Sequence, residues 1–309
     1  MNGFSIPSHH HKRNPQLHLP ARHAILDVAM ASFPSRLTSL PLAAPRQAFS
    51  APLAYWHLLS LDAPTVATLW LCFIARTTHQ HLAPAFAAAM FLFVWILYAL
   101  DRILDARDIR TPDTLEARHH FHHRHRRAFR IAITVVTLAL PPLVIKSHLP
   151  IRTFEFYAAM ASALGLWFLA VHLRPTRSLP KEFVTGLFFS AALWVPFASR
   201  QALVPALLFA ALCTLNCIYI HTWENTSAAP AHRTTTLARR HLPQVSLVLI
   251  LVSLLRATPI SIPIALAAAL LVFLNEFQTN FELTTLRAAA DLVLLTPVLF
   301  LPFFPLLSK

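Results

Sequence analysis

The chain has 309 residues, of which 56% are hydrophobic and only 13% are charged. Soluble domains carry about 25% charged residues, so this composition excludes an ordinary soluble fold. The formal net charge of +13 does not indicate a nucleic-acid partner, because the basic residues lie between apolar runs, where membrane topology places them.

Residues 1–50 are rich in Pro, Ser, His and basic residues and contain no long apolar run. They also lack the apolar segment of a signal peptide. We expect a disordered N-terminal tail here, followed by one transmembrane domain over residues 51–309.

Nine apolar runs follow the tail, most of them long enough to cross a bilayer core of about 30 Å as a helix. The sequence therefore predicts an all-α, multi-pass membrane bundle of about nine transmembrane helices. Prolines or charged residues interrupt or border the third, seventh and ninth runs. The expected spans are 62–78, 83–103, 129–147, 154–172, 182–199, 202–222, 242–256, 260–276 and 285–306.

Lys and Arg are distributed unevenly between the two predicted sides. If the loop after the second span lies inside, the inside loops hold 15 of them and the opposite side holds 6. The positive-inside rule then places that loop in the cytoplasm. The same loop contains the His-rich segment 119–127, for which three interpretations stay open: topology and contact with anionic lipid, closure over a substrate, and metal binding.

Three of the 13 acidic residues fall within residues 98–111, YALDRILDARDIRT. Asp101, Asp105 and Asp108 are spaced i, i+4, i+7, so they share one face of a helix end. Like charges at a helix C-terminus repel one another and oppose the helix dipole, so a cation must compensate. Two alternatives stay open: ion pairs with the interleaved arginines, or a Mg²⁺ ion that also holds substrate phosphates.

The run ALDRILDARDIRT resembles the first aspartate motif of the UbiA-type intramembrane prenyltransferases, DRxxDxxxxRT, which follows the second membrane helix. Three further segments occur in the order of that family. LLSLDAPTVATLWL (58–71) is similar to its opening Leu-Asp-x-Pro segment, and residues 173–198, which include Gly186, are similar to its connection between helices four and five. LNCIYIHTWEN (215–225) stands where the family has its second aspartate motif.

The chain departs from the family pattern at two places. Leu97 and Tyr98 stand where the family has an Asn and often an Asp, and the second motif keeps a single acidic residue, Glu224. A position of Trp223 and Glu224 at the membrane interface is the alternative to a metal-binding role for Glu224.

The resemblance implies Mg²⁺-dependent transfer of an isoprenyl group from an isoprenyl diphosphate to a lipophilic acceptor, for example an aromatic one, in the membrane. The alternatives are a non-catalytic UbiA-like protein that binds isoprenoids or lipids, and a small-solute or ion transporter that uses Asp101, Asp105 and Asp291. The site residues implied for the enzyme are Asp101, Asp105, Glu224 and Asn216 as Mg²⁺ ligands, Arg102 and Lys181 at the diphosphate, Arg174 and Arg177 as further cations, and Tyr98 and Tyr219 near the allylic carbon.

Two ionisable residues at the edges of spans have less specific interpretations. Asp291 follows Arg287 at i+4, which favours a local ion pair or a hydrogen bond to a neighbouring helix, with a proton relay as the alternative. His57 borders the first span, which favours an interfacial position.

Overall fold

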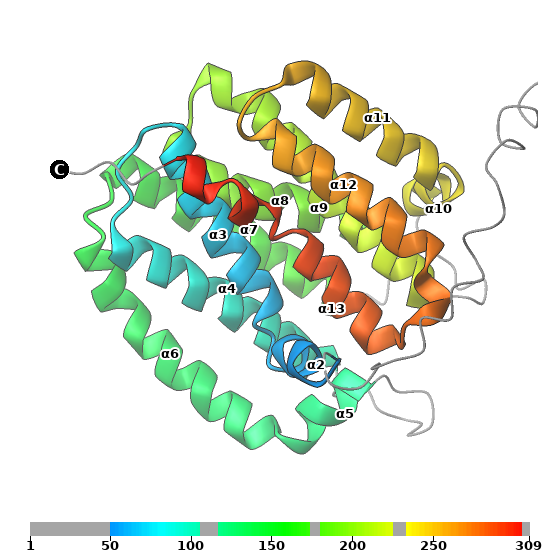
Figure 1. The fold of residues 1–309 in the computed structure, drawn as a ribbon. Coiled ribbons are helices and arrows are strands. Elements are labelled where there is room, and N and C mark those ends of the chain that lie inside the picture. The colour runs from blue at the N-terminus through cyan, green and yellow to red at the C-terminus, as the bar shows by residue number, and fades with distance from the viewer. Residues whose placement is uncertain (1–49, 106–116, 174–179, 225–232, 305–309) are drawn as a thin grey trace, which may run out of the picture. The chain divides into compact units, whose positions relative to one another are not determined.

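The computed structural model describes residues 50–105, 117–173, 180–224 and 233–304, all within the unit Gln47–Lys309. In these ranges every regular element is a helix (Figure 1). The predicted all-α class is therefore confirmed. The predicted tail, up to residue 49, lies outside the described residues.

A helix lies in each of the nine predicted spans. In chain order these helices are α3 (Asp62–Thr77), α4 (Pro84–Asp105), α6 (Arg126–Lys146), α7 (Ile151–Leu173), α8 (Lys181–Trp194), α9 (Leu203–Glu224), α11 (Leu242–Arg256), α12 (Ser261–Glu276) and α13 (Leu283–Val293). Shorter helices, α2 (Ser50–Leu58), α5 (Ala117–Arg124) and α10 (Arg233–Arg240), precede α3, α6 and α11.

Three helices in the described ranges, α4, α6 and α9, are long and apolar enough to cross a membrane. The number rises to five if two bent pairs, α2 with α3 and α10 with α11, each count as one span. The structure thus has three to five candidate spans. Nine crossings remain a prediction.

Apolar side chains cover much of the outside of the bundle. Leu138 of α6 is 72% exposed and Leu255 of α11 is 85% exposed, and only 6% of the most apolar stretch of α6 is buried. By contrast, Asp62 and Arg102 are buried. An apolar exterior around buried charges is consistent with a membrane protein, because exposed apolar side chains are favourable in lipid and charged side chains are not.

The core joins the first and last helices to α9. Trp70 of α3 donates its indole N–H to the carbonyl oxygen of Leu294 at 2.8 Å, and its ring lies 4.4 Å from that of Phe209 on α9. α13 ends at Val293, and short 3-10 segments, Thr296–Leu299 and Leu301–Phe303, follow it. The span predicted over 285–306 is therefore not one continuous helix, because Pro297 and Pro302 lack the amide hydrogen that would extend it.

Helices α8 and α9 approach closely at Gly186. A Cβ atom at this position would lie 2.8 Å from the carbonyl oxygen of Ala210 and would overlap the side chain of Thr214. Ser190, one turn further along α8, donates its hydroxyl to the carbonyl of Ala206 at 2.7 Å. Small residues thus let the two helices come close enough for the Ser190 hydroxyl to reach a backbone carbonyl of α9.

We expect Gly186→Ala to lower the free energy of unfolding by about 1–3 kcal/mol, the usual cost of overpacking a close contact. The matched control is Gly165→Ala on α7, where a new Cβ meets no described atom within 4 Å. The control should be neutral or stabilising by up to about 1 kcal/mol, because a helical alanine loses less backbone entropy on folding than glycine. Denaturant unfolding of the detergent-solubilised protein measures both, and equal effects would contradict the close packing.

Candidate functional site

The site begins at the bend between α2 and α3. The two helices meet at 90°, and Ser60 between them has a left-handed φ of 59°, which is uncommon for a residue other than glycine. His57 lies in the last turn of α2 and Asp62 in the first turn of α3. Each charge type suits its helix end, since the helix dipole favours cations at the C-terminus and anions at the N-terminus.

Five side chains from five helices meet beneath this bend, and we call them the buried polar cluster: His57 (α2), Asp62 (α3), Arg102 (α4), Asn216 (α9) and Asp291 (α13). Four of them are almost inaccessible, with exposed fractions of 2% for His57, 0% for Asp62, 6% for Arg102 and 5% for Asn216. The fifth, Asp291, is 17% exposed in its side chain. Their convergence buries ionisable groups that are costly to remove from water unless they are paired.

Arg102 connects the first three helices. Its Nη2 donates to Asp62 Oδ2 at 3.2 Å, and its Nη1 donates to the backbone carbonyl of His57 at 2.9 Å. The second bond adds to the one that the Ser60 amide donates to the same carbonyl at 3.0 Å, so Arg102 helps to close the C-terminus of α2. Asp62 Oδ2 also lies 2.6 Å from His57 Nδ1, and Asp62 Oδ1 accepts the amide N–H of Ala63 at 2.9 Å.

Asn216 and Asp291 join the cluster from the opposite side. The Nδ2 of Asn216 donates to Asp291 Oδ1 at 2.9 Å, and Asp291 Oδ2 lies 3.8 Å from His57 Nδ1. The hydrogen bond confirms that Asp291 bonds to a neighbouring helix. His57 is buried against two carboxylates, and its position at the membrane interface stays a prediction.

Tyr98 and Tyr219, which the resemblance assigned to one allylic carbon, lie on different helices. Tyr98 lies one helical turn before Arg102 on α4. Tyr219 lies three residues after Asn216 on α9, and its hydroxyl lies 2.9 Å from the hydroxyl of Ser246 on α11. The Tyr219 hydroxyl is therefore directed toward α11.

A second group of charged residues lies further along α9. Glu224 forms an ion pair with Arg287 of α13, one turn before Asp291 on that helix. His221 Nδ1 lies 3.5 Å from Glu182 of α8. Asn216 and Glu224, both expected to bind Mg²⁺, therefore contact different levels of α13 and are not brought to one point.

Trp223 is also turned into the protein. Its indole N–H donates to Asn275 Oδ1 of α12 at 3.1 Å, and the residue is buried. The indole of Trp223 is thus engaged within the protein, and an interfacial depth for this residue stays a prediction.

The predicted aspartate motif lies at the end of α4. Asp101 is exposed, whereas the next residue, Arg102, is buried; consecutive helical residues project about 100° apart. Asp105 is the last residue of α4, and its side chain lies outside the described part, as do Asp108, Arg174 and Arg177. Lys181 is exposed at the start of α8. Asp101 and Lys181 are thus exposed near helix ends, whereas Arg102 is engaged inside.

The His-rich segment packs on the same bend. His122 of α5 is fully buried, and its Nε2 lies 3.3 Å from the hydroxyl of Ser60. Its ring also contacts that of Phe129 of α6, with centroids 4.5 Å apart and planes tilted by 39°. α5 therefore covers the bend next to α2 (Figure 1).

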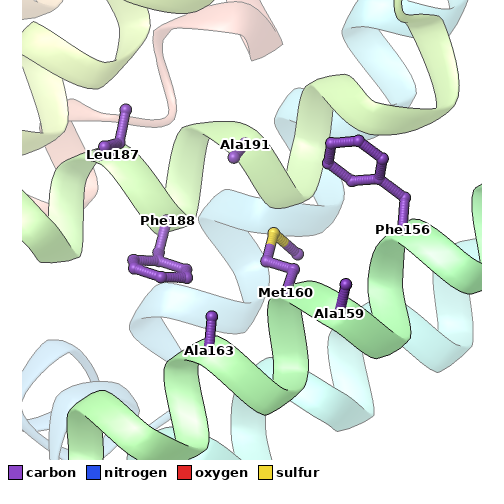
Figure 2. A pocket seen from close by; sticks show the side chains of 7 residues that line it. All are labelled: Phe156, Ala159, Met160, Ala163, Leu187, Phe188 and Ala191. Atoms are coloured by element: carbon purple, nitrogen blue, oxygen red, sulfur yellow. The ribbon is translucent and has the colours of Figure 1, made fainter.

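An apolar pocket of about 470 Å³ lies between α7 and α8. Phe188 of α8 and Met160 of α7 point into the space between the two helices (Figure 2). The lining has no ionisable group and consists of Phe156, Ala159, Met160, Ala163, Leu187, Phe188 and Ala191. Such a pocket suits a hydrocarbon chain and can supply no acid–base chemistry.

Sequence reasoning gave no site role to His57 or to Asp62. The signal for Asp62 was present, because a carboxylate that begins an apolar run is costly at membrane depth and indicates a buried partner. The partner could not be named, since Arg102 follows it by 40 residues.

We expect Arg102→Gln to lower the free energy of unfolding by about 3–5 kcal/mol, because it leaves the buried Asp62 carboxylate without its guanidinium. Arg127→Gln at an exposed position on α6 is the control and should change stability by less than about 0.5 kcal/mol. The double variant Asp62→Asn/Arg102→Gln should recover part of the loss. Strict additivity of the two single effects would show that the pair is not coupled.

Comparison of the chain with protein-family models, with curated proteins and with solved structures gives no match. The resemblance to the UbiA-type prenyltransferases rests on the four sequence segments.

Proposed function

We propose that the protein binds an isoprenyl diphosphate with Mg²⁺ and transfers the isoprenyl group to a lipophilic acceptor in the membrane. One observation carries this proposal. The four segments that resemble the UbiA-type enzymes are separated along the chain, yet their helices form a connected group in which α3 contacts α4 and α8, and α8 contacts α9.

One contact named here joins two of the segments directly, and the others involve residues beside them. Asp62 of the opening segment pairs with Arg102 of the first aspartate motif. Asn216, from the segment in place of the second motif, bonds to Asp291, which lies 3.8 Å from His57 beside that pair. Gly186, from the segment between helices four and five, packs against Thr214 of α9.

The proposed roles of the charged residues follow from whether each side chain is exposed or buried. Asp101, with Asp105 one turn later, offers carboxylate oxygens at the end of α4, which is the ligand type that Mg²⁺ prefers. Lys181, exposed at the start of α8, is the cation that would meet the diphosphate. Arg102 has a positioning role in this scheme, because its guanidinium already holds Asp62 and the α2 carbonyl.

The chemistry requires stabilisation of a leaving group. The bond between the isoprenyl carbon and the diphosphate oxygen breaks, diphosphate departs with the electron pair, and the acceptor forms the new bond and loses a proton. When bound, Mg²⁺ would neutralise the charge on the departing diphosphate. Lys181 would add to this electrostatic effect, and Tyr98 would place an aromatic ring beside the allylic cation.

The isoprenyl tail needs an apolar channel, and the pocket between α7 and α8 supplies one. It begins at Leu187, roughly 9 Å along α8 from Lys181 at 1.5 Å per residue. Tail and diphosphate would then occupy consecutive parts of one helix. Since the lining is entirely apolar, it would select for a hydrocarbon without selecting its length.

The topology forms part of the proposal. We infer nine membrane crossings, with α5 and α10 on the cytoplasmic side, because the loops that contain them hold most of the Lys and Arg. The diphosphate site would then face the cytoplasm. The charged diphosphate group of the substrate would reach the site from water on that side.

One observation favours a second function, a non-catalytic isoprenoid- or lipid-binding protein. Glu224 is the only acidic residue of the segment in place of the second motif, and it pairs with Arg287. A carboxylate held in this way supplies less charge to a metal. Binding without transfer would then be the outcome.

The test is binding of farnesyl diphosphate to the purified protein with and without Mg²⁺, together with release of diphosphate when acceptors are added. We expect Mg²⁺-dependent binding that weakens at least about 10-fold in Asp101→Asn and Asp105→Asn, since each removes one ligand charge. Glu155→Gln, at an exposed carboxylate of α7, is the control and should bind as the wild type does. Binding without diphosphate release would select the non-catalytic function, and binding that ignores Mg²⁺ and both variants would reject the site.

The proposed topology predicts which positions a membrane-impermeant thiol reagent reaches in intact cells. Cysteine at His148 or Ala257, between helices on the outer side, should react from outside. Cysteine at His120 of α5 or His241 after α10 should react only after permeabilisation. The native Cys72, Cys213 and Cys217 are buried or half-buried, so they provide a low background. The opposite labelling pattern would invert the orientation.

A further inference from the structure

We propose that the buried polar cluster is a binding site for one divalent transition-metal ion, of which Zn²⁺ is the representative, with His57, Asp62, Asp291 and Asn216 as ligands. This site is separate from the proposed Mg²⁺ site at the end of α4. His57 Nδ1 and one carboxylate oxygen each from Asp62 and Asp291 lie within 4.8 Å of one another. These three donors come from three helices, so an ion would bind α2, α3 and α13 together.

Asn216 supplies an independent reason to place an ion here. Its Oδ1 atom is buried and has no hydrogen-bond partner among the described residues, and the residue is only 5% exposed. The orientation of the amide is fixed, because its Nδ2 donates to Asp291 Oδ1 and a reversed amide would bring two acceptor oxygens together. An acceptor left unsatisfied in a buried site is costly, and a cation would satisfy it.

The charges of the cluster also favour a cation. As metal ligands, Asp62 and Asp291 would be ionised and His57 neutral. The cluster would then present two carboxylate charges beside the single positive charge of Arg102, and a divalent ion would compensate the excess. A metal ion balances it and uses the lone pair that neutral His57 offers.

The donor set indicates which ion fits. An imidazole nitrogen beside carboxylate and amide oxygens suits Zn²⁺ and related transition metals, whereas Mg²⁺ and Ca²⁺ select oxygen ligands. Zn²⁺ bonds of 2.0–2.2 Å place neighbouring tetrahedral ligands about 3.3 Å apart. The separations of His57 Nδ1 from the two carboxylates, 2.6 Å to Asp62 and 3.8 Å to Asp291, lie on either side of that value.

The surroundings of Asp62 match those of a metal-binding carboxylate. Arg102 donates to the Oδ2 atom and the amide of Ala63 donates to Oδ1. Such outer hydrogen bonds hold a ligand in orientation and tune its basicity. Arg102 would act as a positioning residue for the metal as well.

The experiment uses the full chain, stripped of metal with a chelator and titrated with Zn²⁺ or Mg²⁺ alone, without any isoprenyl diphosphate. We expect Zn²⁺ to raise the midpoint of thermal unfolding and to bind one high-affinity site, and Mg²⁺ to do neither. Asp291→Asn, which keeps the shape of the side chain, should weaken that site at least about 100-fold, more than the loss of an outer-shell partner costs. Asn216→Ala should weaken it about 10-fold or more, and it serves as the second variant if Asp291→Asn does not fold.

The control removes exposed histidines that could bind Zn²⁺ adventitiously. The double variant His120→Gln/His123→Gln on α5 alters exposed residues and should retain both the site and the thermal shift. Equal Zn²⁺ affinity in wild type and Asp291→Asn, or no stabilisation by Zn²⁺, would overturn the proposal and leave a hydrogen-bonded ion network only. Because no diphosphate is present, this outcome is distinguishable from failure of the transferase proposal.

Discussion

The pairing of Asp62 with Arg102 is the interaction on which the rest of the described structure depends. A carboxylate at the start of an apolar helix is tolerable in lipid only if a cation meets it there. Arg102 meets that need from α4, and its second hydrogen bond closes the end of α2. The bend at Ser60 brings His57 of α2 to this pair, and α13 brings Asp291 close to His57.

Much of the fold could be predicted from hydrophobic run length, since each predicted span contains a helix. Periodicity could not reveal that α2 and α3 form a bent pair, because no Gly or Pro stands at residues 59–61 and the break depends on the left-handed Ser60. The end of α13 was missed for another reason: the apolar run continues through Pro297 and Pro302, and composition alone does not distinguish a helix from 3-10 turns. The length of an apolar run therefore overestimates the length of the helix where the run contains several prolines.

The candidate site was less predictable than the fold, because its pairs are distant in sequence. Asn216 was singled out from its place in a motif, yet its partner, Asp291, lies 75 residues away. Asp101 and Arg102 are adjacent in the predicted motif, yet Asp101 is exposed and Arg102 is buried. Consecutive helical residues project about 100° apart, and the sequence motif does not show which of them faces the interior.

The most direct test of the proposed function is an experimental structure of the protein with Mg²⁺ and a non-hydrolysable thiodiphosphate analogue of farnesyl diphosphate. We predict that the diphosphate lies beside Asp101 and Asp105 within reach of Lys181, and that the farnesyl chain enters the pocket between α7 and α8. An analogue bound at the opposite ends of these helices, or no bound analogue at saturating concentration, would contradict the proposed site.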